Sequence, residues 1–325
     1  MRWLITGIGG FVGSYLAELL LTQGVEVFGT IHEASDGVQH LRSRVSLLGC
    51  DVLDQSQVRQ ALESAHPDVV VHLAARSHIP ASWQDPEATL RTNVLGTLNL
   101  LGAVRDSGLA PLVMLAGSST EYGPSRDGSP LHEETPVSPS SPYAISKAAA
   151  TLLARSYAKA FGLKTIVFRP FQFIGPRKLS DASSSFACGI VKIERGEQTA
   201  LSVGNLEAVR DVMDVRDGVR AIWLIATEGE PGKVYNISSG QGHRVQELLD
   251  TLISLSHKRI GVVRDPRLLR PVDEPAIVGD NTRIRRLGWR NEVSLEASLR
   301  DILDYWRERW TPSAANFLGE EVEKA

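Results

Sequence analysis

The fold is decided by a stretch near the start of the chain, TGIGGFVGSYLAELL at residues 6–20. Glycines stand at positions 7, 9, 10 and 13, between an apolar run at residues 3–5 and an amphipathic run. Glycine permits a tight turn and lets backbone N–H groups approach a pyrophosphate, to which a helix N-terminus adds partial positive charge. The Gly-x-x-Gly-x-x-Gly spacing therefore predicts a strand, a phosphate-binding turn and a helix. A plain strand–helix turn with glycines for packing is the alternative.

Short apolar segments alternate with amphipathic ones through the first half of the chain. Continuous apolar strands separated by helices are typical of a parallel sheet that is covered on both faces. We therefore expect an α/β fold, a Rossmann-type doubly wound parallel sheet with a smaller α+β substrate-binding cap. The expected strands are residues 3–6, 26–29, 46–48, 69–73, 112–115 and 165–168, and the expected helices are 11–22, 55–64, 93–107 and 143–161.

The regular alternation weakens after residue 169, which indicates where the domains divide. We expect a dinucleotide-binding Rossmann domain at residues 1–170, to which residues 211–240 return as a helix and a strand. The proline-rich loop at 125–142 within it is not expected to form regular structure. We expect a substrate domain at 171–210 and 241–310, with a helix near 186–195 and a loop at 203–211, and a tail at 311–325.

Composition argues against several classes of protein. The net charge of −3 offers no bulk attraction to nucleic acid or to an anionic membrane. No apolar run reaches the length of a membrane span, about 18 residues. The first residues lead directly into an expected strand, so we expect no signal peptide. Cys50 and Cys188 stand alone, which favours buried thiols in a reducing cytoplasm over a disulfide. No cluster has the spacing of metal ligands, so we expect no metal.

The end of the second expected strand bears on the choice of cofactor. Dinucleotide folds often hold the ribose 2′-hydroxyl with an acidic residue there, but residues 28–32 read FGTIH. The missing acid removes a repulsion against a 2′-phosphate, which His32 or Arg42 can approach. This favours NADP(H), with NAD(H) as the alternative. Asp51, after the third strand, is a candidate partner for the adenine edge or, alternatively, a helix N-cap.

Tyr143 and Lys147 carry the clearest chemical signal in the sequence. Their i, i+4 spacing places the phenol and the ammonium on one face of a helix, although two surface residues can share this spacing. A free phenol has a pKa of about 10, and a nearby cation lowers it toward the range of a useful acid or base. Ser118 follows the fifth strand at the carboxyl edge of the sheet, where ligands bind. Asn93 begins the expected helix at 93–107, where a polar side chain can order water or backbone behind the site.

The glycine turn, Asn93, Ser118, Tyr143 and Lys147 together resemble the extended short-chain dehydrogenase/reductase superfamily, over residues 1–310. The segments HLAA at 72–75, RPF at 169–171 and RDVMDVRD at 210–217 match as well. The resemblance implies that Ser118 and Tyr143 bind the C4 oxygen of a sugar and that Lys147 anchors the nicotinamide ribose. It assigns the other cofactor contacts to Gly7, Gly10, Phe11, Val12, Gly13, His32, Asp51, Val52, Leu73, Ala74, Ala75 and Arg169.

The segment VGNLEAVRD at residues 203–211 resembles the GDP-mannose branch of this superfamily, as do RPVDEP at 270–275 and VGDN at 278–281. In that branch the Arg210-Asp211 pair corresponds to a diphosphate clamp and Arg270-Pro271 to a second one, since a guanidinium fork suits a diphosphate. The implied substrate is a GDP-linked 4-keto-6-deoxy sugar. The implied substrate-binding residues are Ser119, Thr120, Gln172, Lys192, Val203, Asn205, Arg210, Arg270 and Glu274.

Position 120 distinguishes dehydration from reduction. Dehydratases of the branch carry a glutamate two residues after the serine or threonine that matches Ser118, because they must remove the C5 proton. Thr120 stands there instead, and Glu121, on an extended chain, would point to the opposite side. The resemblance therefore implies reduction of the C4 ketone of GDP-4-keto-6-deoxy-mannose. Gln172 and Phe173 replace the asparagine and histidine that are usual in the reductases, which leaves the sugar and its C4 stereochemistry open.

Two other functions are weighed against reduction. One is a 4,6-dehydratase or 4-epimerase with tightly bound NAD(P), and the other is a protein that senses NADP without turnover. Intact Tyr143 and Lys147 disfavour the sensor, because sensors of the superfamily generally lose one of them. The resemblance also implies a homodimer formed through the helices at 93–107 and 143–161, both of which carry apolar residues all round.

Overall fold

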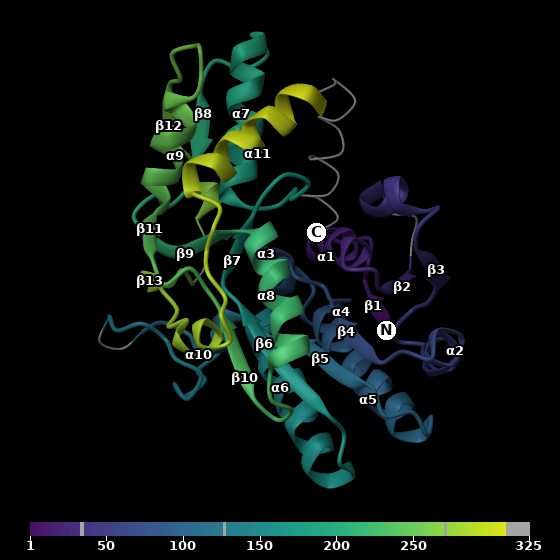
Figure 1. The fold of residues 1–325 in the computed structure, drawn as a ribbon. Coiled ribbons are helices and arrows are strands. Elements are labelled where there is room, and N and C mark those ends of the chain that lie inside the picture. Colours follow the sequence, from purple (N-terminus) through teal and green to yellow (C-terminus); the bar gives the residue numbers. More distant parts are fainter. Residues whose placement is uncertain (33–35, 126–127, 270–271, 310–325) are drawn as a thin grey trace.

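The computed structural model describes residues 1–32, 36–125, 128–269 and 272–309. Within these residues a parallel seven-stranded sheet has the strand order β10-β6-β5-β4-β1-β2-β3 (Figure 1). The order reverses between β1 and β4, and ligands of such folds bind beyond the carboxyl ends of the strands at this point. The strands are β1 (Arg2–Thr6), β2 (Glu26–Ile31), β3 (Ser46–Gly49), β4 (Val69–His72), β5 (Leu112–Ala116), β6 (Thr165–Pro170) and β10 (Val234–Ile237).

Helices cover both faces of this sheet. Successive residues of β1 show the division: Trp3 and Ile5 are buried in one apolar cluster and Leu4 in another. The first cluster lies under α1 (Phe11–Thr22) and α8 (Val215–Glu228). The second lies under α2 (Gln55–Ala65), α5 (Gly96–Asp106) and α6 (Pro142–Phe161).

The start of α6 is fixed by local signals that also fix the position of Tyr143. Ser141 is the N-cap and accepts a hydrogen bond from the N–H of Ala144, while Pro142 occupies the first turn. Tyr143 therefore lies in the first turn of the helix. Shorter elements connect the rest of this domain: η1 (Asp36–Leu41), α3 (Ile79–Gln84), α4 (Pro86–Leu90), η2 (Arg91–Leu95) and η3 (Ser119–Glu121).

A smaller α+β layer occupies the upper part of Figure 1, where α7, α9 and α11 lie together. We call it the cap. Its strands form a small sheet in the order β11-β9-β13, with β7 also paired to β9, and a separate pair, β12-β8. The elements are β7 (Gln172–Ile174), α7 (Ala182–Arg195), β8 (Leu201–Val203), β9 (Val209–Asp214), β11 (Gly242–Arg244), α9 (Val245–Ser254), β12 (Val262–Arg264), η4 (Pro266–Leu268), β13 (Ala276–Ile277) and α11 (Leu295–Arg309). The short helix α10 (Thr282–Arg286) lies instead against β10 of the large sheet, and its Ile284 belongs to the first apolar cluster.

The expected α/β fold with a smaller α+β layer is confirmed. The expected loop at 203–211 is wrong at both ends, because it begins inside β8 and ends inside β9, which pair with neighbours in the cap. The domain division stays a prediction. Within the segment 211–240, α8 and β10 lie with the large sheet, whereas β9 lies in the small one. The tail at 311–325 lies outside the described residues.

The structure also bears on the cysteines, on metal ligands and on membrane-spanning helices. Cys50 and Cys188 are buried free thiols. Among the described residues, no group of histidine, cysteine and acidic side chains is arranged to hold a metal ion. In the same part of the chain, no helix is both long and apolar enough to cross a bilayer.

Candidate active site

The glycine turn joins β1 to α1 at the carboxyl edge of the sheet. Gly7 has a φ of 72°, and a Cβ there would lie 2.9 Å from the backbone of Ala74. A Cβ on Gly13 would lie 2.5 Å from the carbonyl oxygen of Gly7. Gly10 caps α1 without a side-chain hydrogen bond, so the helix N-terminus has no side-chain acceptor of its own. This backbone cradle fits the diphosphate of a dinucleotide.

His32 and Asp51 follow β2 and β3 at the same edge. The His32 Nε2 lies 3.7 Å from the Asp51 Oδ2, and the His32 side chain is 65% exposed. Asp51 accepts the N–H of Leu53 at 2.9 Å, while Asp54 provides the N-cap of α2. The alternative that Asp51 caps the helix is therefore wrong. The other expected cofactor residues at this edge are Phe11 and Val12 at the start of α1, Val52 after β3, and Leu73, Ala74 and Ala75 after β4.

A buried chain of hydrogen bonds lies beneath the turn. The His72 Nδ1 lies 2.7 Å from the Thr6 Oγ1, and its Nε2 lies 3.2 Å from the Thr97 Oγ1. The same Thr6 oxygen accepts the N–H of Ala74 at 3.2 Å. Burial, together with the charge of Lys147, lowers the pKa of His72 to about 3, so its ring is neutral at physiological pH. The chain ties β1 to the segment after β4.

Asn93 lies behind this edge and holds backbone in place. Its Oδ1 accepts the N–H of Arg76 at 2.8 Å, and its Nδ2 donates to the Arg76 carbonyl at 3.0 Å and to the Ser146 Oγ at 2.8 Å. The expectation that Asn93 begins a helix is wrong, because it lies within η2, a single π-helical turn between α4 and α5. Its contact with Ser146 links that turn to α6, next to Lys147.

Tyr143, Lys147 and Ser118 come together where β5 ends. The Lys147 Nζ lies 6.0 Å from the centre of the Tyr143 ring and donates to the Ala116 carbonyl at 2.9 Å. Burial lowers the pKa of Lys147 to about 8. Burial also raises the pKa of Tyr143 to about 12, although a hydrogen bond with Ser118 opposes it. The protein's own groups therefore keep the phenol protonated, contrary to the expectation that Lys147 lowers its pKa.

Glu121 departs from the expected extended chain, because η3 is a 3₁₀ turn with Ser118 as its N-cap. The Glu121 carboxylate is fully buried and accepts the N–H of Ser118 at 2.8 Å. It also pairs with Arg169, whose Nη2 lies 2.9 Å away. Arg169, expected at the cofactor, is thus engaged by Glu121, and its guanidinium lies 4.5 Å from the centre of the Tyr122 ring. The two charges are paired with each other.

Thr120 occupies the position where a dehydratase glutamate is expected. Its Oγ1 lies 2.8 Å from the Ser118 Oγ, so the two hydroxyls are neighbours. The adjacent Ser119 is buried. A threonine hydroxyl does not act as a base near neutral pH, so this turn offers hydrogen bonds but no carboxylate.

Arg210 is held by residues of the cap. Its Nη2 lies 2.6 Å from the Asp273 Oδ1, and its Nη1 donates to the Glu274 carbonyl at 2.7 Å. Asn205 donates to the other Asp273 oxygen at 2.7 Å. Asp273 was not among the residues predicted from the sequence, although it lies inside the RPVDEP segment. Arg270, the second expected clamp, lies outside the described residues.

A cavity of about 350 Å³ lies beside Asp273, a volume typical of small-molecule sites. The cavity is lined by Asn205, Arg264, Asp265, Pro266, Leu269 and Asp273.

The other expected substrate residues lie on nearby elements of the cap. Gln172 begins β7, Lys192 lies on α7 and Val203 is buried at the end of β8.

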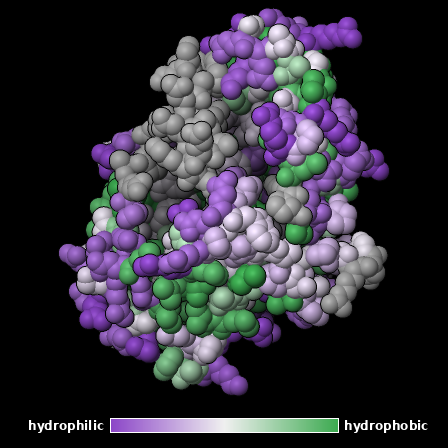
Figure 2. Space-filling model, turned by 180° about the vertical axis from the view of Figure 1, so that it is seen from behind, coloured by the Kyte–Doolittle hydropathy of each residue, from purple (hydrophilic) through white to green (hydrophobic). Residues whose placement is uncertain are grey.

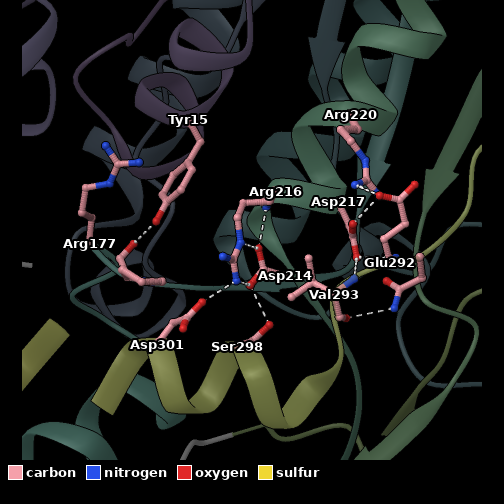
Figure 3. Close-up of polar contacts among 12 residues, drawn as sticks. Tyr15, Arg177, Asp214, Arg216, Asp217, Arg220, Glu292, Val293, Ser298 and Asp301 are labelled. Atoms are coloured by element: carbon pink, nitrogen blue, oxygen red, sulfur yellow. Dashed lines mark hydrogen bonds and ion pairs between the residues drawn. The ribbon is translucent and has the colours of Figure 1, made fainter. Parts of the chain in front are cut away.

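The aspartates of the RDVMDVRD segment have structural partners. Asp211 accepts N–H groups from Ser239, Gly240 and Gly279, so its expected place in a diphosphate clamp is wrong. Figure 3 shows Asp214 and Asp217 at the start of α8, each facing an arginine of the same helix. Asp214 also accepts the hydroxyl of Ser298 on α11, and Asp217 accepts the N–H groups of Glu292 and Val293. These buried carboxylates hold α8 against the segment from Glu292 to Ser298.

One polar contact joins the cap to the loop before α6. Ser140 donates a hydrogen bond to the Glu274 side chain. Glu274 thereby connects the cap segment that holds Arg210 to the residues just before Tyr143. The family resemblance predicted Glu274 as a substrate-binding residue. Its partner Ser140 was not predicted, because it lies 134 residues away along the chain.

Comparisons with known proteins agree with this geometry. The family model of GDP-mannose 4,6 dehydratase matches residues 4–302. The chain is 34% identical over 312 residues to the GDP-6-deoxy-D-mannose reductase of Pseudomonas aeruginosa, covering 95% of this chain and 98% of the relative. It is also 34% identical to GDP-mannose 4,6 dehydratase 2 of Arabidopsis thaliana, over 93% of this chain and 85% of the relative.

A solved structure supports the same relationship. The structure of RMD from Pseudomonas aeruginosa complexed with NADPH has a TM-score of 0.82 and 32% sequence identity. The superposition covers 95% of the present chain and 100% of the Pseudomonas aeruginosa chain. The resemblance to the extended short-chain dehydrogenases/reductases and their GDP-mannose branch is confirmed. The chain therefore belongs to the GDP-mannose 4,6 dehydratase family of the extended short-chain dehydrogenases/reductases.

Proposed function

We propose that this protein is a nucleotide-sugar 4-ketoreductase, which uses NADPH to reduce the C4 ketone of GDP-4-keto-6-deoxy-D-mannose to GDP-6-deoxy-D-mannose. The observation that carries the proposal is the active-site turn. It offers Ser118 and Thr120 to a substrate, while the only nearby carboxylate of the turn, Glu121, is paired with the buried Arg169. A ketone reduction needs a hydride, a proton donor and hydrogen bonds to the oxygen, but no carboxylate base. The reductase of Pseudomonas aeruginosa supports the choice of substrate.

The chemistry follows from the three side chains at the end of β5. NADPH held at the glycine turn supplies the hydride to C4. Tyr143 donates its phenolic proton to the C4 oxygen, which becomes a hydroxyl, and solvent returns a proton to the phenolate. Ser118 donates a hydrogen bond to the same oxygen. Burial disfavours the phenolate that this step leaves, which favours its reprotonation. We assign Lys147 to the nicotinamide ribose, as the family resemblance implies.

The proposed binding sites divide between the two layers. The turn at Gly7 and Gly13 accommodates the cofactor diphosphate, and the exposed His32 lies where a 2′-phosphate would be recognised. NADPH is therefore the favoured cofactor, and NADH is the alternative to be tested beside it. Arg210, fixed by Asp273 next to the cap cavity, is positioned for the nucleotide diphosphate of the substrate.

We also propose a homodimer formed through α5 and α6. Ile145 and Leu152 are 48% and 60% exposed, and seven residues apart they share one face of α6. Leu95, just before α5, and Phe161, at the end of α6, are exposed as well. Figure 2 shows a hydrophobic area low on this face, at the end of the molecule where Figure 1 places α5 and α6. We assign the enzyme to the cytoplasm, where buried thiols stay reduced.

The test is a direct assay of the purified protein. GDP-4-keto-6-deoxy-D-mannose, made enzymatically from GDP-mannose, is supplied with NADPH or NADH, and the product is identified by NMR. We expect one NADPH to be oxidised for each sugar reduced, and a large loss of kcat in the Tyr143→Phe variant. The second candidate, dehydration, has the Arabidopsis relative in its favour. Conversion of GDP-mannose without added NADPH would establish dehydration and refute the reductase.

A further inference from the structure

Glu121 has no role in the proposed chemistry, yet it contacts the segments that carry the site. Its Oε1 accepts the N–H of Ser118 at 2.8 Å and the hydroxyl of Thr151 at 3.2 Å. Its Oε2 accepts from the Arg169 Nε at 3.0 Å. Ser118 follows β5, Thr151 lies one turn beyond Lys147 on α6, and Arg169 lies on β6. One carboxylate therefore joins the three segments behind the reacting groups.

The surrounding packing leaves this carboxylate no other position. Glu121 is 0% exposed, and Arg169 is 4% exposed. A Cβ on Gly117 would overlap the Glu121 Oε1 and lie 3.1 Å from the Arg169 Cγ. Glycine at 117 is thus required for the carboxylate to reach the Ser118 N–H. The segment between β5 and η3 is built around Glu121.

The charges around the site make this carboxylate the counterion of two buried cations. Arg169 forms an ion pair with Glu121. The negative charge of Glu121 also raises the pKa of Lys147, and so opposes the burial that lowers this pKa to about 8. Its charge adds to the burial that raises the pKa of Tyr143 to about 12. The other titratable groups that face this cluster are His72 from β4, Tyr122 from the same turn, and Glu133 beyond Tyr122.

We propose that Glu121 is a positioning residue for the reductase. It fixes the Ser118 turn against α6 and β6, and its negative charge keeps both Lys147 and Tyr143 in their protonated forms. This inference rests on the proposed roles of Ser118, Tyr143 and Lys147. The two parts of the role are separable, because one depends on the length of the side chain and the other on its charge.

Two variants separate length from charge. Glu121→Gln keeps an oxygen that can accept the Ser118 N–H but removes the charge. We expect the alkaline limb of kcat to move by about one unit to lower pH, because Lys147 and Tyr143 then lose their protons more readily. Glu121→Asp keeps the charge but withdraws the oxygen by one methylene. We expect it to lower kcat while the alkaline limb stays in place, with little change in KM for either variant.

Lys147 can be observed without any substrate. The chain has eight lysines, so protein labelled with ¹³C at the lysine ε-carbon gives a simple spectrum, in which Lys147→Arg identifies the resonance. We expect its titration midpoint to fall in Glu121→Gln and to hold in Glu121→Asp. Glu133→Gln is the matched control, since Glu133 is also a buried carboxylate near an arginine, Arg283. It should leave the midpoint unchanged.

Each outcome decides the inference. A folded Glu121→Gln protein with the wild-type Lys147 midpoint would overturn it. If Glu121→Gln does not fold because Arg169 is left unpaired, the comparison is made between Glu121→Gln/Arg169→Gln and Arg169→Gln. These two proteins differ only in the Glu121 charge, so the Lys147 midpoint must be lower in the double variant. If the wild-type protein reduces no 4-keto sugar, the proposed function fails, and the titration alone still decides whether Glu121 controls Lys147.

Discussion

Gly13 gives the sharpest test of the glycine turn, because the neighbours of a side chain there are all backbone atoms. A Cβ at this position would lie 2.5 Å from the Gly7 oxygen, 2.8 Å from the Ile8 Cα and 2.9 Å from the Ile8 oxygen. No side chain can turn aside to relieve these contacts. In Gly13→Ala the first turn of α1 must therefore move away from the backbone of Gly7 and Ile8.

The magnitude follows from two opposing effects. Alanine in place of glycine inside a helix gains about 1 kcal/mol. Overpacking a closely packed site costs about 1–3 kcal/mol, and rigid backbone neighbours place this site at or above the upper end. We expect a net loss of about 2 kcal/mol in the free energy of unfolding. Since we propose that this turn holds the cofactor diphosphate, we expect the Kd for NADPH to rise about tenfold, or 1.4 kcal/mol.

Gly102→Ala is the matched control. Gly102 lies inside α5, and a Cβ there would meet only the Gln55 Nε2, at 4.0 Å. The same substitution should therefore stabilise the protein by about 1 kcal/mol and leave NADPH binding unchanged. Urea unfolding measures the first quantity and fluorescence titration with NADPH the second. If Gly13→Ala were as stable as Gly102→Ala and bound NADPH like the wild type, the argument for a closely packed phosphate turn would be refuted.

Three other predictions follow from the same structure. Tyr143→Phe should lower kcat by about 10²–10⁴-fold, with the Kd for NADPH unchanged, because only the proton donor is lost; substantial residual turnover would contradict its role. The pKa of His72 is lowered to about 3 in the folded protein, so the unfolded chain binds the extra proton below about pH 6.5. As the pH falls from about 6.5 to about 3, the free energy of unfolding should therefore decrease by up to about 1.4 kcal/mol per pH unit. In urea unfolding at several pH values, His72→Gln should show a smaller dependence of this free energy on pH. Ser140→Ala removes the hydrogen bond to Glu274 and should raise KM for the nucleotide sugar about two- to tenfold with little change in kcat, whereas Glu274→Gln keeps an acceptor and should change KM less.

The parts of the fold that could be predicted depend on short-range pattern. The glycine turn and α1 follow from glycine spacing and helical periodicity, and Tyr143 and Lys147 share a face of α6 because they are four residues apart. The N-cap of α2 was harder to locate, since Asp51 and Asp54 both precede the helix. The structure selects Asp54, which accepts from Ser56 and Gln57. Only Asp51 was considered for this role from the sequence, and the residue that caps the helix lies three positions later.

The parts that could not be predicted depend on partners far along the chain. Arg169 resembled a cofactor ligand, but its carboxylate partner lies 48 residues earlier. Asp211 resembled half of a clamp, but its oxygens are taken by backbone N–H groups 28, 29 and 68 residues later. A charged residue next to a site can serve a ligand or satisfy the buried backbone around it, and spacing does not distinguish the two.

Thr120 and Glu121 show how a displacement of one residue decides the chemistry. In η3 the chain turns so that Glu121 comes back under Ser118, where side chain and backbone of the two residues exchange hydrogen bonds as a capping box. Its carboxylate is then committed to the Ser118 N–H and to Arg169, and the side chain that remains next to the Ser118 hydroxyl is that of Thr120. Moving Glu121 to serve as a base would leave Arg169 buried and unpaired, at a cost of about 3–5 kcal/mol. The carboxylate that stabilises this turn is therefore unavailable for dehydration, and the architecture that holds Ser118 in place itself favours reduction.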